Sequence, residues 1–393
     1  MKVTIIGAGI AGLSTAIALR KFRPDLELVV YEGGSELRAV GAGLLLGANA
    51  VLGFDQLGLK DEVLSVSNVL HFFRIQDSQG RLITQSDNLT INRNLQTISN
   101  FSVHRADLQR LLLAQLSDVT VYLNKRVQEF SQDPKSVRIR FADGTEITTD
   151  YVVATDGIHS VFRRTLLPEV KLRYAGYTCW RGVTGGNVDR PSDAFESGLR
   201  QDNVASEIWG AGKRFGIVPL PNGRVYWFAC VNASARNDPR MAGFGKKQLV
   251  EIFGALHAPI AQLIERTDSN EVLWNDILDF PPVKRFAFER VLLLGDAAHA
   301  TTPNLGQGAC QAIEGAVILG KTLASNLDPG AAFVAFERRR LKRTTSIVNR
   351  SWQLGKVAQL ANPLLAGLRD FALRRIPPSV NERQVKELLD VAF

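Results

Sequence analysis

The sequence predicts an α/β protein: a parallel sheet covered by helices, an inserted antiparallel sheet and a helical C-terminal tail. Three observations support this fold class. A short apolar strand enters a glycine-rich turn and a helix at the N-terminus, the middle region alternates polar and apolar residues between turn signals, and the C-terminal region has helical spacing. With 393 residues, 45% of them hydrophobic and 22% charged, the composition is that of a globular protein. At about 100–200 residues per domain, this length predicts two domains.

The N-terminal segment is predicted to bind a dinucleotide. Val3–Ile6 is a β-branched run typical of a buried strand, and Leu13–Phe22 has helical spacing. Between them, Gly7 permits a tight turn, Gly9 lets the backbone approach a pyrophosphate, and Gly12 lets helix and strand pack closely. The phosphates would then lie at the helix N-terminus, where free N–H groups favour anions.

A second predicted strand, Leu28–Tyr31, ends at Glu32, which lies 20 residues beyond Gly12. An acidic residue at this offset is expected to accept hydrogen bonds from ribose hydroxyls. This context makes the glycine pattern specific for a dinucleotide. It does not distinguish FAD from NAD.

Two later segments extend the predicted nucleotide-binding sheet. The segment HRADLQ begins a predicted helix at Arg105, with a start that we expect to be capped. The run Tyr151–Ala154 predicts a buried strand, which leads into the turn Asp156-Gly157.

The most informative segment follows the predicted strand Val291–Leu294. It reads GDAAHATTPNLGQG over Gly295–Gly308, and a predicted helix then runs from Ala309 to about Ala324. The backbone N–H groups where that helix begins suit the electron-rich edge of a flavin. Asp296, just past the strand end, suits a ribityl hydroxyl. This segment therefore favours FAD.

Taken in order, GAGIAG with Glu32, HRADLQ, Asp156-Gly157 and GDAAHATTPNLGQGACQAIEGA resemble the class A FAD-dependent aromatic monooxygenases over roughly residues 1–350. These enzymes share the para-hydroxybenzoate hydroxylase fold. The most similar branches are the FAD-dependent urate hydroxylases and the zeaxanthin epoxidase-like enzymes. The resemblance implies a Rossmann-like FAD-binding domain (1–70, 101–171 and 284–345), an inserted antiparallel β-sheet substrate domain (71–100 and 172–283) and a C-terminal helical segment (346–393).

The resemblance also implies the chemistry. NADPH or NADH would bind transiently and reduce the bound FAD, and O2 would form a C4a-hydroperoxyflavin that hydroxylates a small aromatic or heteroaromatic substrate. Asp156-Gly157 would help to hold the pyrophosphate and to dock NAD(P)H, and no metal is expected. The residues implied to contact FAD are Gly7, Gly9, Ala11, Gly12, Glu32, Gly33, Arg105, Val127, Asp156, Asp296, Gly306, Gln307, Gly308, Ala309 and Cys310.

By the same resemblance, Arg214 and Tyr226 are the substrate-holding and catalytic candidates. Arg214 would anchor an anionic or carbonyl-rich substrate. Cys179 stands where urate hydroxylases have an asparagine, and a thiol cannot replace an amide that both donates and accepts. We therefore expect a more apolar aromatic substrate than urate. Pro303 would border the reacting edge of the flavin, and Leu45 stands where a hydroxynicotinate hydroxylase has a catalytic histidine, so no base is expected there.

The hairpin between Arg214 and Tyr226 provides a geometric condition. Side chains alternate along strands, so the two residues share one face only if the hairpin loop has an odd number of residues. A three-residue loop, Pro221-Asn222-Gly223, with Gly223 in the left-handed region, would pair Leu220 with Arg224 and meet that condition.

The net charge of +8 lies mostly in the tail, because residues 331–393 carry 12 Lys and Arg against 5 Asp and Glu. We predict that this tail folds back on the body with its charges solvated; peripheral contact of a basic amphipathic surface with a membrane is the second interpretation. No nucleic-acid partner is expected, because the arginines are not interleaved with stacking aromatics. The absence of a signal peptide and the three cysteines without a Cys-x-x-Cys pair predict a reducing, cytoplasmic location. The oligomeric state is left open.

Other functions stay open at this point. An epoxidase of an alkene or polyprenoid is one alternative, and a flavin-dependent reductase or dehydrogenase of a lipid-like substrate is another. A non-catalytic flavin- or ligand-binding protein is the third. Substrate-dependent NAD(P)H consumption without O2 would favour the reductase, and an absent or non-reducible flavin would favour the binding protein.

Overall fold

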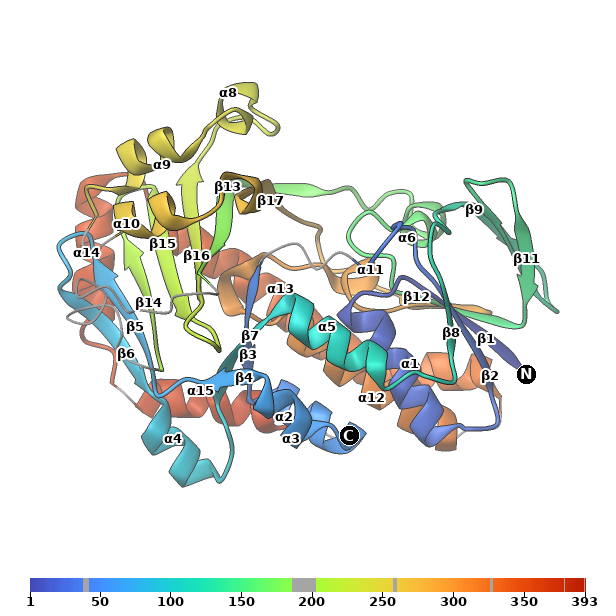
Figure 1. Ribbon diagram of the computed structural model, residues 1–393. Helices are drawn as coiled ribbons and strands as arrows, with labels where there is room; N and C mark the ends of the chain where they lie inside the picture. The colour runs from blue at the N-terminus through green and yellow to red at the C-terminus, as the bar shows by residue number, and fades with distance from the viewer. Residues whose placement is uncertain (38–41, 186–202, 257–259, 326–327, 378, 392) are drawn as a thin grey trace.

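The computed structural model describes residues 1–37, 42–185, 203–256, 260–325, 328–377, 379–391 and 393. Two large sheets lie at opposite ends of the molecule, with helices α12 (Gly308–Ser325) and α13 (Pro329–Ala358) running through the middle (Figure 1). The predicted α/β class with an inserted antiparallel sheet and a helical tail is confirmed.

The parallel sheet contains the predicted nucleotide-binding strands. Its six strands follow the order β18-β19-β12-β1-β2-β8, and only β18 runs antiparallel to its neighbour. Their bounds are β1 Lys2–Ile6, β2 Glu27–Tyr31, β8 Thr120–Tyr122, β12 Tyr151–Ala154, β18 Ala287–Phe288 and β19 Val291–Leu293. The central strands read as continuous apolar runs because helices bury the sheet. Helix α1 (Ile10–Phe22) packs against α12, which brings the N-terminal turn next to the segment after β19.

The antiparallel sheet has seven strands in the order β17-β13-β16-β15-β14-β5-β6. Their bounds are β5 Phe72–Asp77, β6 Leu82–Asp87, β13 Arg173–Thr184, β14 Val204–Trp209, β15 Lys213–Pro219, β16 Val225–Asn232 and β17 Leu273–Asp279. One face packs on α9 (Lys246–Phe253) and α10 (Ile260–Arg266) through a core that includes Trp180, Phe215 and Trp227. The pleat therefore turns the alternate residues of these strands toward the FAD-domain side.

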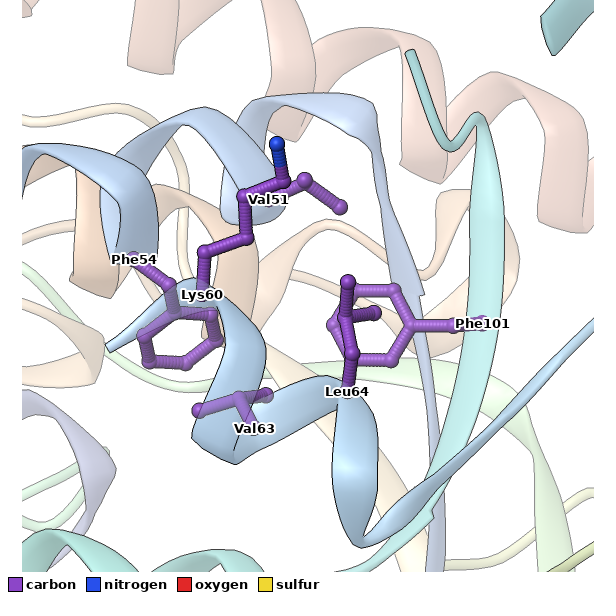
Figure 2. A pocket seen from close by; sticks show the side chains of 6 residues that line it. All are labelled: Val51, Phe54, Lys60, Val63, Leu64 and Phe101. Carbon is purple, nitrogen blue, oxygen red and sulfur yellow. The ribbon is translucent and has the colours of Figure 1, made fainter. Parts of the chain in front are cut away.

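Smaller elements join the two large sheets. One three-stranded sheet has the order β3-β7-β4, and another has the order β11-β10-β9. Their bounds, with those of the remaining FAD-domain helices, are β3 Gly43–Gly47, β4 Ser67–Val69, β7 Asn100–His104, β9 Val127–Gln132, β10 Val137–Phe141, β11 Glu146–Thr149, α2 Ala48–Leu57, α3 Lys60–Ser65, α5 Arg105–Ala114, α6 Val161–Leu166 and α11 Asp296–His299. Figure 2 shows an apolar hollow between α2, α3 and β7, lined by residues such as Phe54 and Phe101. It has no room for a water molecule, so it is a gap in side-chain packing.

The structure adds helices that the alternation of polar and apolar residues did not predict. Helix α4 (Asn88–Leu95) interrupts the region expected to be strand, because the Asp87 side chain accepts a hydrogen bond from the Thr90 N–H and caps it. Helix α8 (Pro239–Ala242) begins in the same way at Asp238. The division into domains stays a prediction, and its boundary at 345/346 lies inside the continuous helix α13.

The tail forms α13, α14 (Pro363–Leu373) and α15 (Ser379–Leu389). The prediction that its charges are solvated is wrong for α14 and for Arg340 of α13, which is buried in an ion pair with Glu314. Arg369 and Asp370 are buried and form an ion pair, while Leu364 and Leu368 are exposed. The Arg369 guanidinium donates to the Ala358 carbonyl and lies 4.8 Å from the Trp209 ring centre, which explains why the charged side of the helix faces the body.

Candidate functional site

The glycine-rich turn has the backbone that the fingerprint requires. Gly7 has φ +100°, and a Cβ there would lie 2.6 Å from the Thr155 carbonyl oxygen. A Cβ on Gly12 would lie 1.8 Å from the Gly7 carbonyl oxygen. At Gly9, by contrast, nothing lies within 4 Å of that position. The turn is therefore tightly packed at Gly7 and Gly12 and open at Gly9, where the first N–H groups of α1 suit a pyrophosphate.

Glu32 ties the end of β2 to this turn. Its carboxylate accepts hydrogen bonds from the Ala8 N–H (2.8 Å) and the Gly34 N–H (2.7 Å). Each carboxylate oxygen accepts two hydrogen bonds, so the predicted contact with ribose hydroxyls is compatible with both. Gly33 and Val127 lie at the same end of the sheet; a Cβ on Gly33 would contact Arg126 at 3.3 Å, and the Val127 side chain is buried in the core.

Three charged side chains of the predicted FAD site, Asp296, Arg105 and Asp156, come from segments that are distant in sequence. The protein that surrounds the Asp296 carboxyl raises its pKa by limiting its solvation, although part of the residue stays exposed to solvent, and the Arg105 charge opposes the rise. Arg105 therefore lies near Asp296, as the predicted shared site requires. Asp156 accepts a hydrogen bond from the Val161 N–H through one oxygen, while its buried Oδ1 has no partner among the described residues. The expected cap before Arg105 is wrong, because His104 makes no side-chain cap bond.

The loop before α12 presents backbone rather than side chains. Gly306 is left-handed with φ +63°, and a Cβ there would lie 3.5 Å from the Leu45 carbonyl oxygen. The Gln307 side chain turns inward and accepts a hydrogen bond from the Asn49 amide. The Cys310 thiol is buried and accepts from the Gly47 N–H. Burial raises the pKa of this thiol to about 12. Of the predicted contacts in 306–310, only backbone groups are thus available to a cofactor. They include the free N–H groups of the first turn, at Gly308, Ala309 and Cys310.

The remaining predicted contacts lie around this loop. A Cβ on Gly295 would lie 2.8 Å from the Cβ of Ala11, so the fingerprint helix and the segment after β19 touch directly. Pro303 begins a short 3-10 turn and is exposed beside the loop. The open position at Gly9 fits the pyrophosphate of FAD, the Asp296 carboxylate fits its ribityl hydroxyls, and the free N–H groups at the start of α12 fit its ring edge.

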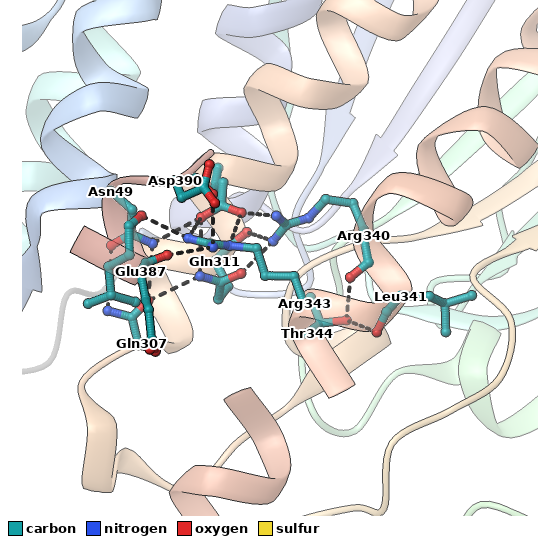
Figure 3. A network of polar contacts seen from close by, with 11 residues as sticks. Asn49, Gln307, Gln311, Arg340, Leu341, Arg343, Thr344, Glu387 and Asp390 are labelled. Carbon is teal, nitrogen blue, oxygen red and sulfur yellow. Dashed lines mark hydrogen bonds and ion pairs between the residues drawn. The ribbon is translucent and has the colours of Figure 1, made fainter. Parts of the chain in front are cut away.

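A buried polar network holds α12 in place (Figure 3). The Glu314 carboxylate is fully buried, and it pairs with Arg340 and Arg343 and accepts from Asn49. Burial opposes its ionisation, but the two arginines outweigh burial and lower the pKa of Glu314. This network was not predicted from the sequence, because its members come from the separate helices α2, α12 and α13. Arg343 extends it to a fourth helix by donating to a carbonyl of α15.

The substrate-side hairpin has the odd-numbered loop. The Leu220 N–H donates to the Arg224 carbonyl, so Pro221–Gly223 form a three-residue loop, with Gly223 at φ +70°. Arg214 pairs with Cys230 across β15 and β16. Since Tyr226 lies four residues from Cys230, it shares a face with Arg214, as the condition requires.

Arg214 is already engaged in a buried cluster. Its guanidinium donates to Glu207 (2.9 Å), Asn304 (2.8 Å) and Gln359 (3.1 Å). Burial disfavours the cation, but the Glu207 charge outweighs it and raises the pKa of Arg214 above its ordinary value. Arg214 is therefore a cation whose charge is already compensated by Glu207, and its role as the anchor of an anionic or carbonyl-rich substrate stays a prediction.

Asn304 joins this cluster to the flavin loop. Its side-chain oxygen accepts from Arg214 and from the Tyr177 hydroxyl (3.0 Å), and its amide donates to Thr302 and to the Ser351 carbonyl. Sequence reasoning missed Asn304, Glu207 and Gln359. Glu207 could have been predicted from the hairpin 210–212. Trp209 pairs with Arg214, and Glu207 lies two residues before Trp209, so it shares the face of Arg214.

Tyr226 and Cys179 lie further along the same face. Tyr226 packs on Gly43, and a Cβ added to Gly43 would lie 2.5 Å from the Tyr226 ring. Burial raises the pKa of the Tyr226 hydroxyl, and its contact with Arg181 opposes the rise. Cys179 is buried opposite Cys230 and beside Tyr177. Leu45 contributes to an apolar cluster with Tyr226, Val218 and Phe73, so the position expected to lack a base is indeed an apolar wall.

A separate basic cavity of about 230 Å³ opens beside Asp156-Gly157. Its lining includes His159, Arg164 and Lys171. Burial and the nearby charges of Arg236 and Arg164 lower the pKa of His159. This chemistry suits the phosphates of NAD(P)H, whose docking near Asp156-Gly157 stays a prediction.

Comparison with known proteins agrees with this site. Residues 1–351 match the family model described as FAD binding domain. The chain is 35% identical to aurachin C monooxygenase/isomerase of Stigmatella aurantiaca, over 95% of this chain and 94% of that one. It is 31% identical to an FAD-dependent urate hydroxylase of Klebsiella pneumoniae, over 96% of each chain.

Two further relatives extend the comparison. The chain is 30% identical to 2-heptyl-3-hydroxy-4(1H)-quinolone synthase of Pseudomonas aeruginosa, over 98% of this chain and 96% of that one. The crystal structure of Klebsiella pneumoniae HpxO with FAD and uric acid superposes with a TM-score of 0.88 and 29% identity, over 99% of this chain and 97% of that one. With the glycine-rich turn, the flavin loop and these matches in agreement, the chain belongs to the FAD binding domain family and is an FAD-dependent monooxygenase of class A.

Proposed function

We propose that this monooxygenase hydroxylates an electrically neutral, N–H-bearing heteroaromatic substrate of the quinolone kind. The observation that carries the proposal is the buried ion pair between Arg214 and Glu207. A lone buried arginine would select an anion, because an unpaired buried charge is strongly unfavourable. Here Glu207 already compensates the charge of Arg214, so an anionic substrate bound at Arg214 would bring its negative charge beside the Glu207 carboxylate.

The cluster offers both kinds of hydrogen bond to a neutral ring. Arg214 has five N–H donors and uses three of its nitrogens on protein partners, so donors remain for a carbonyl oxygen. Glu207 is an acceptor for a ring N–H. The buried Nε2 of Gln359 has no partner among the described residues, and it adds a second donor. A 4-quinolone presents one N–H and one carbonyl, which matches this set.

The rest of the sheet face suits apolar groups. Phe73, Val218 and Leu45 form one apolar cluster with Tyr226, and the thiols of Cys179 and Cys230 lie beside Arg214. Arg214 and Tyr226 lie about 13 Å apart along the strand direction, because four residues separate Tyr226 from the partner of Arg214. This separation favours a ring that carries an apolar substituent. The quinolone synthase relative, whose product has a heptyl group, supports the same class.

The protein side of the reaction follows from these positions. Reduced by NAD(P)H, bound FAD supplies the activated oxygen that is transferred to an electron-rich ring. The turn at Gly7–Gly12, Glu32, Asp296 and the backbone of 306–310 would hold the cofactor. Arg214 and Glu207 would orient the ring against the Pro303–Gly306 edge, and Leu45 and Val218 would exclude water. Tyr226, whose raised pKa keeps its hydroxyl protonated, would donate toward the substrate.

The experiment compares neutral and anionic rings as substrates of the FAD-loaded enzyme. Stimulated NADPH and O2 consumption would be measured with 2-heptyl-4-quinolone, urate and 3-amino-4-hydroxybenzoate, and the product would be weighed for one added oxygen. We expect the quinolone to give the highest kcat/KM. A higher kcat/KM for the benzoate would refute the proposal.

Glu207→Gln tests the role of the ion pair. Without the compensating charge, the ratio of kcat/KM for the benzoate to that for the quinolone should rise by about tenfold or more, since an anion then pairs with Arg214. The matched control is Glu129→Gln, which removes a carboxylate from an exposed pair with Arg140 and should leave the ratio unchanged. An unchanged ratio in Glu207→Gln would contradict the assignment. Arg214→Met/Glu207→Gln should lower kcat/KM for all substrates without weakening FAD binding.

A further inference from the structure

We propose that the exposed face of α14 docks on the surface of an anionic lipid bilayer. The helix presents its apolar side chains to solvent: Leu364, Leu365, Leu368 and Phe371 are 84%, 51%, 62% and 52% exposed. With Val357 and Ile376, they are six of the eleven large apolar side chains that the described residues expose. A patch concentrated in this way marks an interaction surface.

The fold itself exposes the apolar side of α14, because the charged side of the helix faces the body of the protein. Arg369 and Asp370 are buried between α14 and the sheet, and the spacing 364, 365, 368, 371 forms one continuous stripe on the other side. A solvent-exposed helix normally has the opposite arrangement. In Figure 1, α14 lies at the outer edge of the molecule beside β6, so nothing else in the described chain covers the stripe.

The charges around the stripe identify the occupant. Arg375 lies over the ring of Phe371, a member of the stripe, and it has no ion-pair partner in the described part of the chain. Between 351 and 381, the only acidic residue is Asp370, which is already paired with Arg369. An apolar stripe that carries a free cation and no free carboxylate fits an anionic lipid surface. A second copy of this chain would instead bring like charges together.

The contact would be peripheral. No helix among the described residues combines the length and the hydropathy that crossing a bilayer requires. The segment that joins α13 to α14 contacts the substrate cluster. Gln359 accepts a hydrogen bond from Arg214, and the Leu360 carbonyl accepts one from the Gly212 N–H. A bound lipid surface would therefore lie next to the elements that hold the substrate.

The test is flotation of the full, FAD-loaded chain with vesicles. We expect it to float with vesicles of phosphatidylcholine containing about one-third phosphatidylglycerol, and much less with pure phosphatidylcholine. Leu364→Ser/Leu368→Ser should weaken binding by about tenfold or more, because both leucines are exposed and their replacement removes inserted apolar area. Arg375→Gln should reduce the preference for the anionic lipid, because it removes the free cation of the stripe.

The matched control is Leu89→Ser, an equally simple change at an exposed leucine of α4, which should bind like the unmodified protein. Thermal unfolding would verify that all variants fold. No flotation at either composition, or equal flotation of the leucine variant, would overturn the proposal. So would a dimer in lipid-free solution that Leu364→Ser/Leu368→Ser dissociates, since the stripe would then be covered by a second copy. None of these readouts depends on turnover, so failure here is distinct from failure of the proposed function.

Discussion

Within the flavin segment Gly295–Gly308, Asp296 is the side chain that we expect to contribute most to FAD binding. Burial raises the pKa of its carboxyl, and no described residue donates to it, so a ligand hydroxyl is its natural partner. We expect Asp296→Ala to weaken FAD binding about 10- to 100-fold, which is the value of a hydrogen bond to a charged acceptor. Fluorescence titration of the apoprotein with FAD measures this loss. Asp296→Asn keeps an acceptor and should lose less affinity.

The same residue gives a pH dependence with a defined sign. A carboxyl with a raised folded pKa binds its proton more tightly in the folded state, so its contribution to stability is present at low pH and is lost as pH rises through the folded pKa. Asp296→Asn should therefore stabilise the apoprotein at pH 7, and this advantage should shrink as pH falls toward 4. Denaturant unfolding at several pH values measures it. Unchanged FAD affinity in Asp296→Ala, with the fold intact, would show that the segment is assigned wrongly.

Among the elements, the docking of α15 depends on one partly buried arginine, Arg343. Arg343 donates to the Leu388 and Glu387 carbonyls and pairs with the fully buried Glu314. We expect Arg343→Gln to lower the free energy of unfolding by about 1.5–3 kcal/mol, the range for hydrogen bonds to charged groups. It should also increase hydrogen exchange at 379–389. Thermal unfolding and exchange mass spectrometry would measure the two effects.

Arg350→Gln is the matched control for α15. Arg350 also reaches this helix, through Glu387, but both side chains are about half exposed. Exposed pairs contribute at most about 1 kcal/mol, so this change should leave exchange in α15 almost unaltered. Equal loss of protection in both variants would mean that the buried network does not hold the helix.

Sequence reasoning succeeded for elements whose signal is local. The strand, turn and helix of 2–22 are contiguous, and the hairpin register follows from three residues, Pro221–Gly223. It failed for α14, because an amphipathic pattern shows that one side is apolar and not which side faces the body. Arg369 is buried only because Trp209 and the Ala358 carbonyl, remote in sequence, lie beneath it.

The same limit applies to the site as a whole. The cofactor-facing segments were predictable because each is a short motif with its own backbone requirement, as at Gly7 and Gly306. The partners of Arg214 were not, since Glu207, Asn304 and Gln359 come from a strand, a loop and a helix end that only the assembled fold brings together. The prediction of an anchor for an anionic or carbonyl-rich substrate was made without that information, and the compensated pair favours the carbonyl-bearing alternative.

Across the whole molecule, Asn304 is the residue that links the two halves of the reaction site. It lies in the flavin loop, accepts from Arg214 and Tyr177 on the sheet, and donates to Ser351 on α13. Its loss would leave the Arg214 and Tyr177 donors partly unpaired and free the substrate sheet from the flavin loop. Because a misplacement of about 1 Å can cost about 100-fold in rate, the loss should appear in oxygen transfer rather than in cofactor affinity.

We therefore expect Asn304→Ala to lower the fraction of NADPH that yields hydroxylated product at least about twofold, with the difference released as hydrogen peroxide, because a displaced ring no longer meets the activated oxygen in the productive geometry. FAD affinity should stay within about threefold, since no cofactor contact is assigned to the Asn304 side chain. Thr302→Ala is the control: it removes the two hydrogen bonds of the Thr302 hydroxyl, to Asn304 and to Ser351, while the bonds of Asn304 to Arg214 and Tyr177 remain. If both variants lose product yield equally, or if Asn304→Ala loses FAD to the same degree, then Asn304 only shapes the loop and the substrate cluster is positioned by other contacts.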